Sequence, residues 1–94
     1  MSAYVIGHIA VIDAQKWAQY RSQVPATLTP WGGEVMMRGH RAAVLSGHHA
    51  YTDMVVLRFP NVDAVEGWYA SPAYQALVPL REQGADVVLV SYES

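Results

Sequence analysis

The residues best suited to chemistry in this sequence are an arginine and a histidine two positions apart, Arg38 and His40. Alternate residues of a strand point to the same face, so the two side chains are expected side by side. Histidine titrates near neutral pH, and a neighbouring positive charge favours its neutral form, which can accept a proton. The pair predicts acid/base chemistry, with His40 as the base and Arg38 holding an anionic or enolate oxygen. The alternative is an exposed pair without a function on an edge strand.

The other histidines offer weaker candidates. His8 lies in an apolar stretch, where it is either a core residue with satisfied ring nitrogens or the wall of a pocket shared with Tyr4. His48 and His49 are neighbours near a turn, and a metal site there needs a third ligand such as His40 across the hairpin. Since the chain has no cysteine and no helical pair of histidines, we expect no bound metal.

Three aromatic residues and one arginine form a second group of candidates: Tyr20, Trp68, Tyr74 and Arg81. Packing alone explains most aromatic residues, but a buried tyrosine hydroxyl or tryptophan N–H needs a polar partner. Arg81 follows Tyr74 by seven residues, which places both on one helical face. The arginine is either a cation in a pocket or one half of an ion pair at a dimer boundary.

Composition restricts the class of protein. The chain has 94 residues, of which 52% are hydrophobic and 15% charged, so it forms a single folded domain over residues 1–94. A net charge of −2 argues against nucleic-acid binding, and no apolar run reaches the length of a membrane span. We see no secretory signal and expect a cytoplasmic protein. Without a glycine-rich phosphate loop or a serine-hydrolase motif, we expect no nucleotide and no other cofactor.

The elements that must position these residues follow from hydrophobic patterning. Apolar or alternating runs predict strands, and apolar residues spaced by three and four behind an Asp, Asn or Ser cap predict helices. Pro25 is expected to kink the first helix or end it early. The predicted strands are Tyr4–Ile12, Glu34–Arg41, Asp53–Phe59 and Val87–Tyr92, with a possible extension of the second through residues 43–45, and the predicted helices begin after Asp13, Asn61 and Ser71, the last ending at Gly84.

The order β-α-β-β-α-β predicts an α+β, ferredoxin-like fold with a four-stranded antiparallel sheet in the strand order 4-1-3-2. On the second strand, simple alternation places Glu34 and Met36 on the face of Arg38 and His40. The helices can cover one face of the sheet, yet the first and last strands are apolar on both faces. We therefore expect a homodimer in which two sheets pack face to face as a dimeric α+β barrel.

The segment Trp68-Tyr69-x-Ser71-Pro72-x-Tyr74-Gln75-x-Leu77, followed by Arg81, resembles the signature of a bacterial family of domains of unknown function, the one numbered 1330. Gly32-Gly33 with Arg38-Gly39, and the strand ending in Phe59-Pro60, agree with it. The family resembles the dimeric α+β barrel superfamily, which includes cofactor-free monooxygenases, isomerases, cyclases and haem enzymes. Pockets of that superfamily lie between helices and sheet, which implies Tyr20 and Trp68 as walls and Tyr74 as a hydrogen-bond donor.

The chain departs from the family pattern at its histidines, because His40 stands where a second glycine is common and His48-His49 replace an acidic stretch. The hypothesis is a cofactor-free enzyme that performs isomerisation, cyclisation or lyase-type cleavage on a small aromatic or carbonyl-containing compound. His40, Arg38 and Tyr74 would be catalytic, and Tyr20, Trp68, His8 and Arg81 would bind the substrate. The alternative is a non-catalytic or stress-type module that holds a small ligand in the same pocket.

Overall fold

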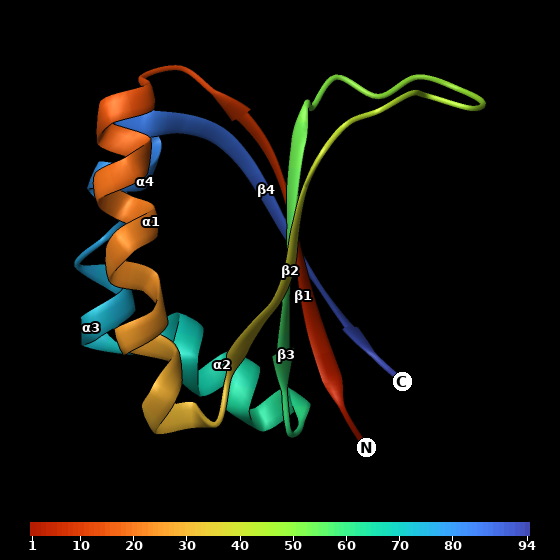
Figure 1. The fold of residues 1–94 in the computed structure, drawn as a ribbon. Helices are drawn as coiled ribbons and strands as arrows, with labels where there is room; N and C mark the ends of the chain where they lie inside the picture. Colours follow the sequence, from red (N-terminus) through yellow and green to blue (C-terminus); the bar gives the residue numbers. More distant parts are fainter.

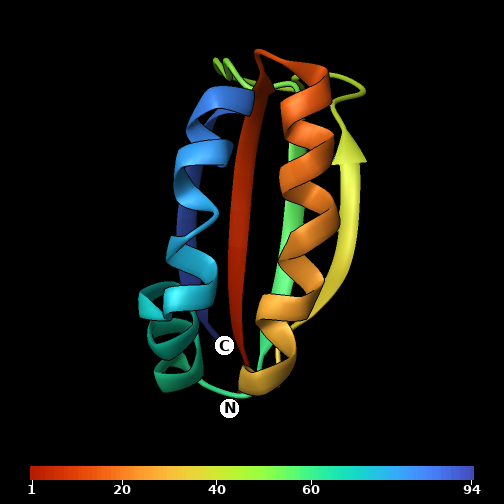
Figure 2. The same cartoon turned by 90° about the vertical axis from the view of Figure 1, so that its left-hand side faces the viewer.

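The computed structural model describes all 94 residues as one four-stranded antiparallel sheet with helices on one face (Figure 1). The strands lie in the order β2-β3-β1-β4, which is the predicted order read from the other edge. Seen from the helical side, α1 crosses in front of the sheet beside the column formed by α4, α3 and α2 (Figure 2). The elements are β1 (Ala3–Val11), α1 (Ala14–Leu28), a 3-10 turn (Thr29–Trp31), β2 (Glu34–His40), β3 (Asp53–Phe59), α2 (Val62–Ala70), α3 (Pro72–Gln75), α4 (Val78–Gly84) and β4 (Ala85–Glu93).

Side-chain caps start three of the helices, as the sequence predicts. Asp13 accepts hydrogen bonds from the backbone N–H groups of Gln15 and Lys16 at 3.1 Å. Asn61 accepts one from Ala64 at 2.8 Å, and the Ser71 hydroxyl accepts one from the backbone of Tyr74 at 3.2 Å. Each cap satisfies donors that a helix leaves free in its first turn, which fixes where the helix begins.

The first helix continues past Pro25, so the expectation of an early end is wrong. Proline removes one backbone hydrogen bond, to the carbonyl of Arg21. The turn around it still buries Val24, Thr27 and Leu28 against the sheet. Tertiary packing supplies most of the stability of helices in proteins, and here it outweighs the lost hydrogen bond.

The last predicted helix is two helices, α3 and α4, separated at Ala76 and Leu77. Pro79 explains the break, because it has no N–H to donate to the carbonyl of Gln75. It lies instead in the first turn of α4, where an N–H needs no partner within the helix. Gly84 ends α4 as predicted, and a Cβ atom on it would lie 2.8 Å from the backbone nitrogen of Trp17. The glycine therefore lets α4 approach the start of α1.

The strands differ from the predicted ranges at their ends. The first strand begins at Ala3, β2 stops at His40, and β4 runs over Ala85–Glu93, longer than predicted. Residues 43–45 do not extend β2. The segment between β2 and β3 instead curls away from the helical layer (Figure 1). Arg41 holds its base, donating a hydrogen bond of 2.9 Å to the carbonyl of His49.

The two faces of the sheet are covered unequally. The face under the helices carries the core, in which Trp68, Tyr74, Phe59 and Leu28 are the largest fully buried side chains. The opposite face, which we call the open face, has no helix over it (Figure 1). No helix of the structure is long and apolar enough to cross a membrane. Side chains of the open face include Tyr4, Ile6, His8, Val56, Arg58, Val88, Val90 and Tyr92.

Candidate functional site

A bulge in β2 decides which residues of this strand face the helices. Val35 pairs with Leu57, but the next pair is Met37 with Val56, so Met36 is the extra residue. The predicted alternation is therefore wrong across this point, and Glu34 and Arg38 lie on opposite faces. Beyond the bulge, Arg38 pairs with Val55 and His40 with Asp53. Both side chains share the face under α1, as their two-residue spacing predicts.

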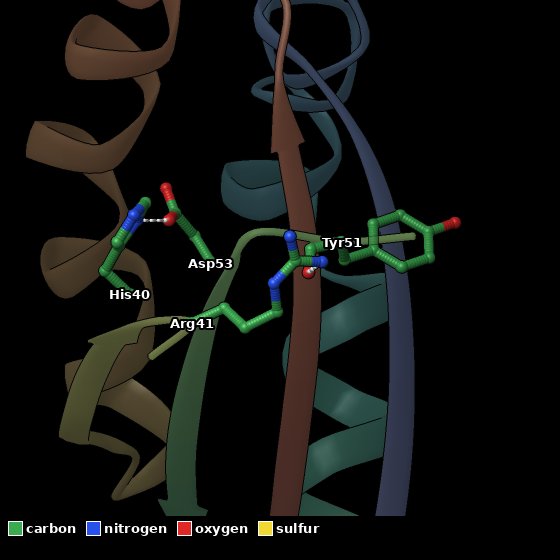
Figure 3. A network of polar contacts seen from close by, with 4 residues as sticks. All are labelled: His40, Arg41, Tyr51 and Asp53. Atoms are coloured by element: carbon green, nitrogen blue, oxygen red, sulfur yellow. Dashed lines mark hydrogen bonds and ion pairs between the residues drawn. The ribbon is translucent and has the colours of Figure 1, made fainter. Parts of the chain in front are cut away.

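His40 is paired with a carboxylate from the neighbouring strand (Figure 3). Its Nδ1 atom lies 2.6 Å from Oδ1 of Asp53. The imidazole is 80% exposed, whereas the Asp53 side chain is 31% exposed. An Nδ1–H that donates to a carboxylate leaves the lone pair on Nε2, which is the form that accepts a proton. The pair is thus a positioned base at the surface of the protein.

Two arginines lie beside this base and lack a carboxylate partner. Arg38 and Arg21 line a shallow cleft of about 300 Å³ together with His40, Asp53 and the indole of Trp17. Desolvation of the covered part of Arg38, followed by the positive charge of Arg21, lowers the pKa of the Arg38 guanidinium below its ordinary value. The two contacts between a basic and an acidic side chain, His40 with Asp53 and Arg58 with Glu34, involve neither of these arginines. We call this hollow between α1 and the sheet, lined mainly by α1, β2 and β3, the histidine cleft. An anion that enters it meets two arginines, and the cleft contains one carboxylate, that of Asp53.

A chain of hydrogen bonds runs through the core from Arg81 to Tyr20. Arg81 donates to the Tyr74 hydroxyl at 2.9 Å, and the hydroxyls of Tyr74 and Tyr20 lie 2.8 Å apart. Either hydroxyl can be the donor; when Tyr74 donates its O–H to Tyr20, the O–H of Tyr20 is left for a ligand to accept. Burial, followed by the charge and hydrogen bond of Tyr74, raises the pKa of the Tyr20 hydroxyl far above its ordinary value.

Tyr74 itself is fully buried and lines none of the four main pockets of the structure. Tyr20 lies in front of it and lines a narrow apolar space beside Arg38. The hydroxyl that meets a ligand on this side of the core is therefore that of Tyr20. Tyr74 can act on such a ligand only through Tyr20 or Arg81.

Trp68 separates this space from a larger pocket on the other side of the core. Its ring packs 4.2 Å from that of Tyr74, and its indole N–H donates to Thr27 at 3.0 Å. The larger pocket, which we call the α2–α4 pocket, has a volume of about 460 Å³. Its lining residues are Val5, Val65, Glu66, Trp68, Tyr69, Arg81, Val87, Leu89 and Ser91.

His8 lies on the open face, across the sheet from the residues above. Its ring is 5.0 Å from that of His49 and 6.1 Å from that of Tyr51, measured between centroids, and its Nδ1 atom is buried without a hydrogen-bond partner. The structure contains no group of three or more metal-ligating side chains, so His40, His48 and His49 do not converge on a metal site.

The structure thus divides the predicted site residues into three places. His40 and Arg38 line the histidine cleft, and Tyr20 lines the narrow space next to it, whereas Arg81 belongs to the α2–α4 pocket and His8 to the open face. Trp68 is a wall on both sides of the core. The sequence reasoning missed two participants in the cleft, Asp53 and Arg21. The signal for Asp53 was its place as first residue of the third strand, where hairpin pairing brings it opposite His40.

Several solved structures share the fold of this chain at low sequence identity. A protein of unknown function from Rhodopseudomonas palustris superposes with a TM-score of 0.84 at 17% identity, covering 99% of this chain and 82% of that one. A dimeric ferredoxin-like protein of unknown function from Jannaschia sp. CCS1 gives a TM-score of 0.80 at 10% identity, with both chains fully covered. SnoaB, a cofactor-independent oxygenase from Streptomyces nogalater, superposes with a TM-score of 0.69 at 10% identity, covering 99% of this chain and 92% of that one.

At these identities the likeness shows the shared fold alone. No curated protein matches the chain in sequence. A family model described as "Domain of unknown function (DUF1330)" matches residues 2–93.

Proposed function

Because the chain belongs to the DUF1330 family, which has no assigned activity, we propose a function from the histidine cleft: cofactor-free acid/base catalysis on a small anionic carbonyl compound. The observation that carries the proposal is the 2.6 Å contact of His40 with Asp53, next to the unpaired Arg38 and Arg21. A base, its orienting carboxylate and cations for a developing oxyanion are what enolisation needs. Isomerisation, cyclisation and lyase-type cleavage all proceed through such a step.

The proposed step moves one proton and one electron pair. Nε2 of His40 takes a proton from the carbon next to a substrate carbonyl, and the C–H electrons form the enolate, whose charge develops on oxygen. Arg38 stabilises that oxygen, while Asp53 stabilises the imidazolium. The imidazolium then returns the proton to another atom of the enolate, or to a leaving group. The Tyr20 hydroxyl is the second donor to the oxygen and takes the role that the sequence assigned to Tyr74.

The walls of the cleft favour an aromatic body on the substrate. Trp17 and Tyr20 stack with ring centroids 4.9 Å apart, and both line the narrow space that leads from the cleft toward Trp68. Stacked aromatic rings present a flat apolar surface with polar edges. An anionic carbonyl compound with an acidic C–H fits the charges of the cleft. The Trp17 indole, which lines the cleft itself, can contact a ring on that compound, whereas the narrow space beyond it, of about 20 Å³, is too small for a ring.

Proton exchange tests the proposal without knowledge of the natural substrate. The probe is phenylpyruvate, an aromatic 2-oxo acid whose benzylic protons exchange with D₂O through the enol, followed by NMR. We expect the protein to accelerate exchange, and His40→Gln to lower the acceleration by about 10²–10⁴. Asp53→Asn is expected to lower it as well, because the imidazole loses its orienting acceptor.

The matched control is His48→Gln, which removes an exposed histidine outside the cleft. It should leave exchange unchanged. Unchanged exchange in a folded His40→Gln variant would remove His40 from the mechanism. If the protein accelerates exchange in none of a panel of aromatic and aliphatic 2-oxo acids, the acid/base proposal is wrong.

The second candidate is a ligand-binding module without turnover. The observation that favours it is the α2–α4 pocket, the larger of the two sites, which contains a cation and apolar walls but no histidine. Compounds that bind and are recovered unchanged in every case would support this function over catalysis.

We also propose that the protein is a homodimer formed across the open face. Its apolar residues include Val88, Val90 and Tyr92, which are 40%, 36% and 53% exposed in the single chain. A contiguous apolar face of this kind usually marks an interaction surface. The Jannaschia protein, which shares the fold, is dimeric, and this supports self-association of the present chain. Light scattering at micromolar concentration tests it, and a folded protein with the mass of one chain would contradict it.

A further inference from the structure

The α2–α4 pocket differs from the histidine cleft in place and in chemistry, and we propose that it is a second binding site, which holds a small aromatic carboxylate by an ion pair with Arg81. The pocket is formed by β1, β4, α2 and α4, whereas the histidine cleft is formed by α1, β2 and β3. Its volume of about 460 Å³ falls within the range of small-ligand sites. No residue of the histidine cleft lines it.

Arg81 supplies the charge that selects the ligand. A guanidinium has five N–H donors, and Arg81 uses one of its nitrogens for the Tyr74 hydroxyl at 2.9 Å. It forms no ion pair, since both ion pairs of the structure lie elsewhere. Burial by itself would lower the pKa of Arg81, but the hydrogen bond and negative partial charge of Tyr74 raise it, so the group stays protonated. A half-buried cation without a counter-charge leaves donors for a carboxylate, which arginine binds in a bidentate manner.

The remaining polar groups of the pocket orient that ligand. Glu66, Tyr69 and Ser91 are exposed and lie at the rim. The carboxylate of Glu66 repels a second negative charge, so it favours a ligand with a single anionic end placed at Arg81. The Tyr69 hydroxyl lies against Arg81, where its hydrogen bond helps to raise the pKa of the guanidinium, so it borders the place of the carboxylate. Because Ser91 can donate or accept a hydrogen bond, the outer end of the ligand can carry a hydroxyl or carbonyl group.

The apolar walls select the body of the ligand. Val65 and Trp68 are buried side chains of α2, and Val87 and Leu89 of β4 face them across the pocket. An indole opposite branched aliphatic side chains forms a slot suited to one aromatic ring. The site therefore fits a benzene-sized ring carrying a carboxylate on a short linker.

The experiment uses 3-phenylpropanoate, which combines this ring and charge, and 3-phenylpropanamide, which has nearly the same shape without the charge. Each is titrated into ¹⁵N-labelled protein, and the backbone amide shifts give both the affinity and the location. We expect the acid to shift residues of α2 and β4 and to bind more tightly than the amide. Arg81→Met should weaken binding of the acid by about tenfold to a hundredfold and leave the amide unaffected, because only the acid uses the charge.

Two further variants make the result decisive. Arg58→Met removes an exposed arginine of the open face and should change neither affinity. Ser91→Trp places a bulky ring at the exposed mouth of the pocket and should block both compounds, including in the case where Arg81→Met fails to fold. The proposal is overturned if the acid binds Arg81→Met as well as it binds the unmodified protein. It is also overturned if the shifts fall on β2 and β3, if Ser91→Trp binds normally, or if the acid does not saturate up to about 10 mM.

Because 3-phenylpropanoate has no readily enolisable proton, its binding does not depend on catalysis by His40. Failure of this site and failure of the acid/base proposal are thus separate results. Binding at the α2–α4 pocket without exchange of phenylpyruvate protons would support this binding site and contradict acid/base catalysis in the histidine cleft.

Discussion

The two faces of the sheet have similar sequences and opposite surroundings. On β1, the side chains of Val5 and Ile9 point under the helices and are 3% exposed, while Ile6 and His8 between them point to the open face and are only half-buried. The open face is nearly as apolar as the covered one. The chain therefore encodes more apolar surface than its own helices can cover, which is the physical reason to expect a second copy on the open face.

The histidines of the two faces also differ in their surroundings, because His40 has a hydrogen-bond partner and His8 has none. His40 lies at an exposed edge, yet Asp53 holds its ring in one orientation. The ring of His8 is more buried, and its Nδ1 atom has no partner at all. Chemical use of an imidazole depends on an oriented ring with a free nitrogen, and burial alone supplies neither.

The largest expected effect comes from a charge placed on the open face. Val90→Asp would bury an uncompensated carboxylate in the proposed dimer, and a two-fold interface contains it twice. We expect dissociation to increase by at least about 10³-fold, measured by light scattering over a dilution series. Gln19→Glu, on the exposed surface of α1, adds a charge outside the open face and should leave the mass unchanged. An intact dimer of folded Val90→Asp would show that this face is not the interface.

The covered face is tested by removing its largest side chain. Trp68→Ala leaves a cavity beside Tyr74 and Phe59 and should lower the free energy of unfolding by about 3–5 kcal/mol. Leu45→Ala removes a large apolar side chain that is 96% exposed in the segment between β2 and β3, and should cost less than about 1 kcal/mol. Urea unfolding of both variants gives the comparison, and similar losses would mean that Trp68 does not lie in a packed core.

A finer comparison concerns a single hydroxyl on each face. Tyr74→Phe removes the central member of the hydrogen-bond chain, leaving Arg81 and Tyr20 without their partner, and should cost about 1–3 kcal/mol. Tyr92→Phe removes a hydroxyl that makes no hydrogen bond on the open face, so we expect a change within about 0.5 kcal/mol. Equal effects in urea unfolding would show that the buried chain adds nothing to stability.

The smallest effect is a pH dependence that belongs to the covered face. Burial raises the pKa of the Tyr20 hydroxyl in the folded state. The neutral hydroxyl therefore contributes fully to the free energy of unfolding below the unfolded-state pKa of about 10, and this contribution is lost as the pH rises further. The free energy of unfolding should therefore fall between about pH 9 and pH 11, and it should fall less in Tyr20→Phe. Urea titrations at both pH values measure this difference. Parallel declines in the two proteins would assign the alkaline loss to other groups.

The architecture could be predicted because it follows from local patterns. Caps at Asp13, Asn61 and Ser71 fixed the starts of the helices, and Pro60 fixed the end of the third strand. Given that order of elements, handedness rules leave few arrangements of the sheet. The family resemblance led to the same fold.

The geometry of the site could be predicted only in part, because it depends on strand register. One extra residue at Met36 reverses the faces on either side of it, and nothing in the local sequence marks that position. The partnership of His40 with Asp53 spans thirteen residues and depends on this register. The hydrogen bonds from Arg81 to Tyr20 join residues even further apart. The spacing placed Tyr74 and Arg81 on one face of a single helix, whereas they belong to α3 and α4, and the contact forms across the break between these helices.

The central position of β1 determines when the molecule can fold. The first strand of the chain pairs on one side with β3 and on the other with β4, the last strand to be made. During synthesis the second edge of β1 therefore stays unpaired until residues 85–93 have been made, and its apolar side chains remain exposed to solvent until then. Contacts this distant in sequence are slow to form, so we expect refolding in milliseconds to seconds rather than microseconds. A chain shortened by its last ten residues, which include all of β4, would expose the edge of its own central strand, and aggregation would compete with folding.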